Sequence, residues 1–92
     1  MLPLVFRAHA IQRMFERHIS VEDVRTVIMA GEVIKVYPDD TPYPSRLMLG
    51  WINGRPLHVV AADNLVEQEI IVITAYEPDP NQWEVDFKRR RA

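Results

Sequence analysis

A row of basic side chains near the start of the chain is the first feature that suggests chemistry. His9, Arg13 and Arg17 follow one another at intervals of four residues. Side chains four residues apart lie nearly above one another on a helix, so these three form a ladder on one helical face. Such a ladder can hold a row of phosphate oxygens, because the planar fork of arginine binds two oxygens at once. The spacing therefore predicts a site for a polyanion.

A second candidate feature is the late segment Ile71–Tyr76, which ends on a tyrosine before an acidic, proline-rich turn. Histidine and tyrosine side chains can both transfer protons, so His9 and Tyr76 are candidates for acid–base chemistry. The further candidate side chains are those of His58, Arg46, Arg89 and Arg90.

Several of these residues also have a purely structural interpretation. His9 and Arg13 can simply cover a solvated helix face, where ion pairs contribute little to stability. His58 lies in an apolar segment, where a histidine is usually a core residue whose ring nitrogens have hydrogen-bond partners. Tyr76 can bury its ring and bond its hydroxyl to the following turn, and Trp83 is expected to anchor the end of the chain against a sheet.

Other catalytic chemistries find little support in the sequence. The three histidines do not match a zinc-binding spacing, and the chain has no cysteine. Neither Ser20 nor Ser45 lies in a strand-turn-helix elbow, so a nucleophilic triad is not expected. There is no glycine-rich phosphate loop. We therefore expect neither a metal nor another cofactor.

The composition predicts a single domain over residues 1–92. Of the 92 residues, 48% are hydrophobic and only three are glycine, which is typical of a packed globule. The absence of a long apolar run and of a basic start before an apolar stretch predicts a cytoplasmic protein without a membrane partner. The net charge is −2, but a basic C-terminal tail, Lys88–Arg91, follows an acidic stretch. This tail is expected either to be solvated or to close on a polyanion or a partner.

Two helices are expected before the strands. The segment Phe6–His18 is amphipathic, and its buried side is expected to carry Ala8, Ile11, Phe15 and Ile19. Ser20 is the expected N-cap of a second helix, with Asp23 completing a capping box. Gly31 is the expected end of this helix.

Strands are expected at Glu32–Tyr37, Arg46–Ile52, Arg55–Asp63 and Gln68–Tyr76, and Asn53-Gly54 predicts a hairpin. Pairing across this turn places Leu49 opposite His58 and puts His58 on the core face. Tyr76 is then expected on the opposite face, in a shallow groove. The sequence thus predicts an α+β domain in which two N-terminal helices pack on one face of a curved, mainly antiparallel four-stranded sheet.

The chain resembles a bacterial family known as domain of unknown function 4258. The resemblance is carried by His-Ala-x-x-Arg-Met at His9–Met14, Ile-Ser-x-Glu-Asp-Val ending at Val24, Pro-Leu-His-Val-Val at Pro56–Val60, and the segment from Val72 to Trp83. These motifs cover nearly the whole chain but name no reaction. The element order is similar to that of RelE-type toxins, so the resemblance implies a RelE-like fold.

The wider resemblance implies a small, metal-independent endoribonuclease, the toxin of a bacterial type II toxin–antitoxin pair. Its partners would be RNA, free or bound to the ribosome, and an antitoxin protein, often of a zinc-finger type. Metal-free cleavage of RNA needs a base for the 2′-hydroxyl, an acid for the departing 5′-oxygen and cations for the charge on phosphorus. Under this resemblance His9 is the candidate base, and Tyr76 is the candidate acid or orienting group. The predicted catalytic residues are then His9, Arg13, Tyr76 and His58, and the predicted RNA-binding residues are Arg17, Arg46, Arg89 and Arg90.

Two alternatives to a ribonuclease stay open. One is a non-catalytic protein-binding module, which the acidic net charge favours, and the other is a degenerate toxin that retains only the fold.

Overall fold

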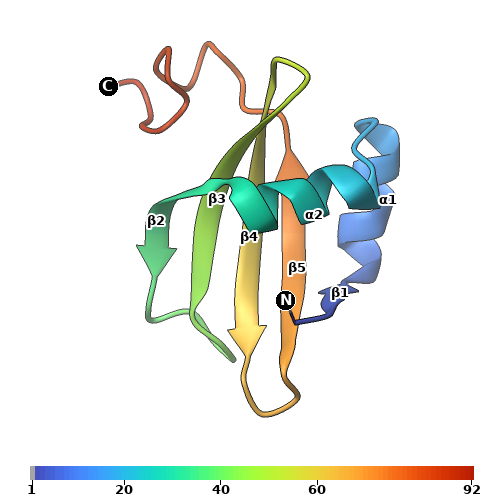
Figure 1. Cartoon of the computed structure of the whole chain (residues 1–92). Coiled ribbons are helices and arrows are strands. Elements are labelled where there is room, and N and C mark those ends of the chain that lie inside the picture. Colours follow the sequence, from blue (N-terminus) through green and yellow to red (C-terminus); the bar gives the residue numbers. More distant parts are fainter. Residues whose placement is uncertain (1) are drawn as a thin grey trace.

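The computed structural model describes residues 2–92, which form two helices and a five-stranded sheet (Figure 1). Along the chain the elements are β1 (Leu4–Phe6), α1 (Ala8–Glu16), α2 (Val21–Ala30), β2 (Glu32–Tyr37), β3 (Ser45–Ile52), β4 (Arg55–Asn64) and β5 (Glu69–Tyr76). Across the sheet the strand order is β1-β5-β4-β3-β2. The fold is therefore α+β overall.

The expected four-stranded, mainly antiparallel sheet is wrong, because β1 adds a fifth strand that runs parallel to β5. In this pair Leu4 lies opposite Ile70, and Phe6 lies opposite Val72. The backbone groups along the outer edge of β5 would be unpaired without this neighbour. The expected helix start at Phe6 moves to Ala8, since a three-residue strand is too short to show its period in the sequence.

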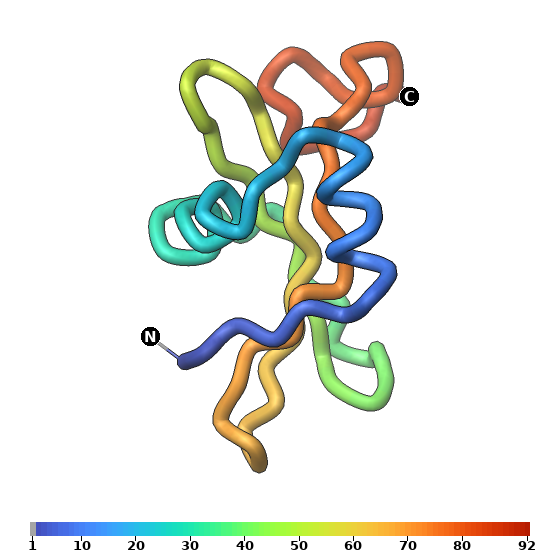
Figure 2. The backbone as a smooth tube through the Cα atoms, turned by 90° about the vertical axis from the view of Figure 1, so that its right-hand side faces the viewer, coloured from blue at the N-terminus to red at the C-terminus, as the bar shows by residue number. Residues whose placement is uncertain are grey.

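The predicted start and end of α2 are confirmed. The Ser20 hydroxyl accepts a hydrogen bond from the Asp23 amide, and the Asp23 carboxylate accepts one from the Ser20 amide, each at 3.0 Å. Gly31 is the C-cap. α2 lies across one face of the sheet, over β3 and β4, whereas α1 runs beside β5 (Figures 1 and 2).

α1 turns a different face to the core from the one expected. Met14 is buried, while Ile11 is 44% exposed and Phe15 is 84% exposed. After the helix the chain reverses through His18, whose φ of 57° is left-handed. The Ile19 amide then bonds to the Met14 carbonyl at 2.9 Å, and both side chains enter the core. This helix ending sets the rotation of α1.

The predicted hairpin at Asn53-Gly54 is confirmed. The two turn residues have positive φ values of 53° and 81°, as a type I′ turn requires, and Leu49 lies opposite His58. The predicted face of Tyr76 is wrong, because a bulge changes the register between β4 and β5. Ile73 is an extra residue without a partner on β4, which turns the side chains after it to the other face. Tyr76 therefore lies directly opposite His58.

Different parts of the chain cover the two faces of the sheet. The main core lies between the helices and the face that carries Met48, Leu57, Val59, Val72 and Ala75. The face that carries His58 lies instead under residues 78–92, which we term the tail and which fold over one end of the sheet on the side away from α2 (Figure 2). The expectation that His58 faces the main core is therefore wrong.

Separate substitutions of Met14 and Phe15 test the rotation of α1. Met14→Ala should lower the free energy of unfolding by about 2–5 kcal/mol, because it leaves a cavity in the core. Phe15→Ala should change it by less than about 0.5 kcal/mol, because the ring lies largely in water. Urea unfolding of both variants measures these values. A larger loss from Phe15→Ala would support the face that the sequence predicts.

Candidate functional site

Tyr76 ends β5 beside a buried histidine. The bulge at Ile73 places Tyr76 opposite His58, and the two rings pack edge to face with their centroids 5.3 Å apart. The Tyr76 hydroxyl oxygen lies 3.3 Å from His58 Nδ1. These two side chains form the centre of the candidate site.

Both ring nitrogens of His58 have partners, although the side chain is fully buried. Nε2 lies 2.8 Å from the Phe87 carbonyl oxygen, which can only accept, so Nε2 carries a hydrogen. In the neutral ring Nδ1 is then an acceptor, and the Tyr76 hydroxyl donates to it. Burial lowers the pKa of His58 below its ordinary value of 6.5; the Phe87 carbonyl opposes this shift and the charge of Arg90 adds to it. The ring is therefore neutral at pH 7.

Aromatic side chains hold the tail over His58. The Trp83 indole meets the imidazole edge to face, with the ring centroids 4.4 Å apart, and is only 7% exposed. The Phe87 ring packs against Trp51 with the centroids 5.8 Å apart. The predicted role of Trp83 as an anchor of the tail is confirmed.

Tyr76 lies between two open cavities, which share its side chain with those of Trp83 and Arg90. The first, which we term the strand-side cavity, has a volume of about 400 Å³ and lies between β2, the end of β5 and the tail. Its lining consists of Ile34, Lys35, Tyr37, Leu47, Tyr76, Trp83, Lys88, Arg89 and Arg90. Four of these residues are cationic and none of them is acidic, so the cavity attracts anions.

The second, which we term the helix-side cavity, has a volume of about 440 Å³ and lies between the end of α1 and the tail. Its charges are mixed, because Glu77 and Asp79 contribute to the lining together with arginines. Arg55 is engaged in holding the fold: its Nε lies 2.6 Å from Glu77, and its other nitrogens donate to the carbonyls of Arg17 and His18 at the end of α1. This cavity therefore suits a polyanion less well.

Three cations around the site form no salt bridge within residues 2–92, namely Arg17, Lys35 and Arg90. The Arg17 guanidinium donates to a backbone carbonyl of β5 at 2.9 Å. The Lys35 ammonium lies 5.3 Å from the centroid of the Tyr37 ring, and the Arg90 guanidinium lies 5.2 Å from that of Trp83. These contacts orient the side chains and leave their charges available to a ligand.

The Tyr76 hydroxyl keeps its proton at neutral pH. Burial raises the pKa of Tyr76 above its ordinary value of 10, and Tyr37 raises it further. The charges of Arg90 and Arg17 act in the opposite direction but do not reverse the shift. Tyr76 thus contributes a neutral hydrogen-bonding group to a side chain that lines both cavities.

The structure brings five of the predicted site residues together. Four of them line the cavities and the fifth lies beneath, where the tail covers it. They are Arg17, Tyr76, Arg89 and Arg90, with His58 below.

The other three predicted site residues lie elsewhere. His9 and Arg13 are on the exposed face of α1 and line neither cavity. Arg46 forms an ion pair with Asp63, with 2.9 Å between its Nη1 and a carboxylate oxygen, and also lines neither cavity. The predicted ladder is therefore divided, and only Arg17 reaches the site.

The cavity lining also contains Lys35 and Tyr37, which the sequence does not single out, and Lys88, which the sequence identifies only as part of the basic tail. The signal for the first two is their spacing, since residues two apart on a strand point to the same face. Lys88 Nζ lies 3.1 Å from a carboxylate oxygen of Glu32, which joins the tail to β2. No local pattern reveals this contact between distant segments.

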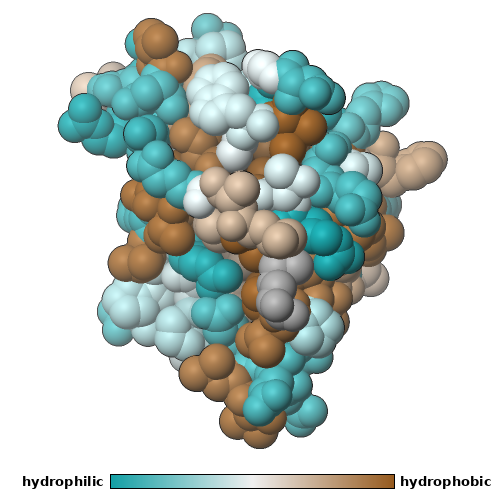
Figure 3. Space-filling view, in the orientation of Figure 1, coloured by the Kyte–Doolittle hydropathy of each residue, from teal (hydrophilic) through white to brown (hydrophobic). Residues whose placement is uncertain are grey.

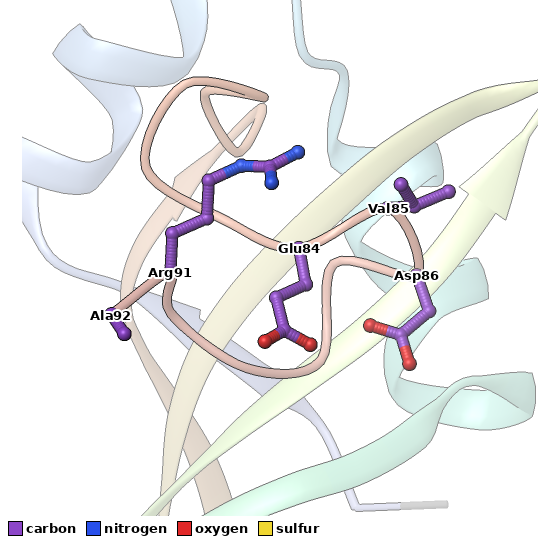
Figure 4. Close-up of a pocket in the computed structure, with 5 residues that line it drawn as sticks. All are labelled: Glu84, Val85, Asp86, Arg91 and Ala92. Carbon is purple, nitrogen blue, oxygen red and sulfur yellow. The ribbon is translucent and has the colours of Figure 1, made fainter.

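A further hollow of about 630 Å³ lies within the tail (Figure 4). It is lined by Glu84, Val85, Asp86, Arg91 and Ala92. The carboxylates of Glu84 and Asp86 point to the same side, away from the Arg91 guanidinium (Figure 4). Two like charges would repel a phosphate, so this hollow is a poorer anion site than the strand-side cavity.

Residues 2–92 contain no group of three or more His, Asp or Glu side chains that could hold a metal ion. Neither helix in this range is long and apolar enough to cross a membrane.

A family model described as "Domain of unknown function (DUF4258)" matches residues 6–77. The chain belongs to this family. No curated protein and no solved structure matches the chain. The DUF4258 match contains both His58 and Tyr76 but ends before the tail. The site thus combines a pair within the family region with Trp83 and Arg90 from beyond it.

The pH dependence of stability tests the buried, neutral state of His58. The pKa of His58 is lowered in the folded chain, so below about pH 6.5 the unfolded chain binds a proton more readily than the folded chain does. The stability that His58 contributes should be complete above pH 6.5 and be lost as the pH falls below that value, by at most about 1.4 kcal/mol per pH unit.

Urea unfolding of the parent and of His58→Gln at pH 7.5, 6.5 and 5.5 measures this effect. The amide of Gln can still donate to the Phe87 carbonyl but does not titrate, so the stability difference between the two proteins should shrink as the pH falls. A difference that stays constant or grows would contradict the assignment.

Proposed function

We propose that this DUF4258 protein binds single-stranded RNA at the strand-side cavity and cleaves the RNA backbone beside Tyr76. The observation that carries the proposal is the lining of that cavity, which has four cationic residues, Tyr37 with Tyr76, and no acidic residue. Cationic grooves follow the phosphates of a single strand, and aromatic rings stack on its bases. The lining therefore suits a flexible polyanion with flat bases.

The acidic net charge of the chain does not oppose this proposal, because local potential governs binding. Of the carboxylates near the site, Glu32 is paired with Lys88, Glu77 with Arg55 and Glu84 with Arg89. Asp79, on the helix-side cavity, forms no ion pair within residues 2–92. Arg17, Lys35 and Arg90, which have no carboxylate partner within residues 2–92, lie around the two cavities. The charge distribution thus offers one basic region on an acidic protein.

The same geometry supports backbone cleavage. Arg17, Lys35 and Arg90 can neutralise the charge that gathers on phosphorus in the transition state. Tyr76 is the group available to carry a proton, and His9, the base expected from the sequence, lies outside both cavities. A ribonuclease of this kind would act in the cytoplasm as the toxin of a toxin–antitoxin pair, and an antitoxin could neutralise it by covering the strand-side cavity.

Charge removal at the cavity should weaken RNA binding. Arg90→Ala should raise the Kd for a fluorescently labelled single-stranded RNA about fivefold and lower the slope of log K against log salt concentration by about 0.7. Arg25→Ala is the matched control, because Arg25 lies on α2, pairs with Glu22 and lines neither cavity. Anisotropy titrations in EDTA measure both quantities. Equal effects of the two substitutions would argue against binding at this cavity.

Removal of the Tyr76 hydroxyl should stop cleavage without unfolding the protein. Tyr76→Phe should lower the cleavage rate by about 10²- to 10⁴-fold, because a proton carrier is lost, while RNA affinity changes little. The variant should stay folded but lose about 1–3 kcal/mol of unfolding free energy, because buried His58 Nδ1 loses its donor. Gel analysis of labelled RNA in EDTA, with and without ribosomes, gives the rate. Undiminished cleavage by Tyr76→Phe would contradict the role of Tyr76. Loss of cleavage in His9→Gln would place the catalytic base on α1 instead.

A non-catalytic protein-binding module is the second candidate, favoured by the outer face of α1. Ile11 and Phe15 lie one helical turn apart and are substantially exposed, and a cavity of about 310 Å³ adjoins Phe15. Apolar side chains reach the surface at the edge of the molecule where α1 lies (Figure 3). Exposed apolar patches often mark protein contacts. Failure of the parent protein to bind RNA would favour this candidate over the first.

A further inference from the structure

The hydrogen bond between Tyr76 and His58 has a direction. The Phe87 carbonyl fixes the imidazole hydrogen on Nε2, so Nδ1 presents a lone pair to the tyrosine hydroxyl. The Tyr76 proton therefore points towards Nδ1, 3.3 Å away, and the free lone pairs of the hydroxyl oxygen are left for the cavities. In this state Tyr76 is placed to accept a proton from a ligand and to pass its own proton inward.

We propose that Tyr76 and His58 form a proton relay, in which Tyr76 takes the proton of the RNA 2′-hydroxyl and His58 receives the proton that Tyr76 gives up. The inference rests on the proposed function, because it assigns the proton path of the same cleavage. Tyr76 is the catalytic residue, since it lines both cavities. His58 is buried and cannot touch RNA, so it is a positioning residue that acts through Tyr76.

The proton transfers of the relay balance over one cycle of cleavage. As the 2′-oxygen attacks phosphorus, its proton passes to the Tyr76 oxygen and the Tyr76 proton passes to His58 Nδ1. The bond from phosphorus to the 5′-oxygen breaks, and the departing oxygen takes a proton from a water molecule. The hydroxide left behind then recovers a proton from His58 through Tyr76. The products are a 2′,3′-cyclic phosphate and a 5′-hydroxyl, and both side chains return to their starting state.

The surroundings of His58 keep its ring neutral and ready to accept. Tyr76 faces it from β5, Leu49 from β3, and Trp83, the Phe87 carbonyl and the charge of Arg90 from the tail. Within residues 2–92 no carboxylate bonds to the imidazole. The rate of cleavage should therefore rise with pH as His58 loses its proton below pH 6.5, and stay level above that value.

His58→Gln separates the relay from the structural role of the histidine. The Gln amide can donate to the Phe87 carbonyl, as Nε2 does, but it cannot take up the Tyr76 proton. Cleavage should fall at least about 100-fold, as in Tyr76→Phe, and the double variant should lose no more than either single one. The Kd for the labelled RNA should stay within about threefold, and the rise of the residual rate with pH should disappear.

The relay is tested by cleavage of this RNA by the parent, Tyr76→Phe, His58→Gln and the double variant, together with ¹⁵N NMR of the histidine-labelled full chain. His58, identified by the signals missing from His58→Gln, should carry its proton on Nε2 at pH 7.5. Protonation of Nδ1 instead would overturn the relay, and so would cleavage by His58→Gln within about threefold of the parent, in which case the proposed function would stand. A parent that binds RNA and leaves it intact would fail the proposed function and the relay together.

Discussion

The buried imidazole of His58 is the constraint on which the rest of the site depends. A polar group that is removed from water and left without a partner costs about 1–3 kcal/mol, so both ring nitrogens must be satisfied. Nε2 bonds to the Phe87 carbonyl and thereby ties the tail to the sheet, while Nδ1 orients the Tyr76 hydroxyl. Because Trp83 and Arg90 belong to the same tail and line both cavities, the cavities take their shape from the docking of the tail on this ring.

The charged residues divide into those that hold the fold and those that remain for a ligand. Arg55 donates hydrogen bonds to two carbonyls at the end of α1 and to Glu77. These bonds join the helix to the end of the sheet. Arg17 and Lys35, by contrast, approach the site from opposite sides and have no carboxylate partner in the described part of the chain. This division gives an acidic protein a local basic surface, which the net charge alone does not reveal.

Local signals in the sequence predict the local parts of the fold, and the site depends on long-range contacts. The capping box at Ser20 and the turn at Asn53-Gly54 are set by neighbouring residues and are predicted correctly. The parallel pairing of β1 with β5 and the bulge at Ile73 have no local signature. The bulge alone moves Tyr76 to the face of His58, so the sequence identifies both residues but not their contact.

The central claim is that RNA binds around Tyr76, and an NMR titration of the ¹⁵N-labelled full chain with single-stranded RNA tests it most directly. The backbone signals that shift should belong to β2, the end of β5 and the tail, because these segments line the strand-side cavity. Arginine side-chain signals should shift for Arg90 and not for Arg13. Shifts confined to the outer face of α1, or no shifts at all, would contradict the account.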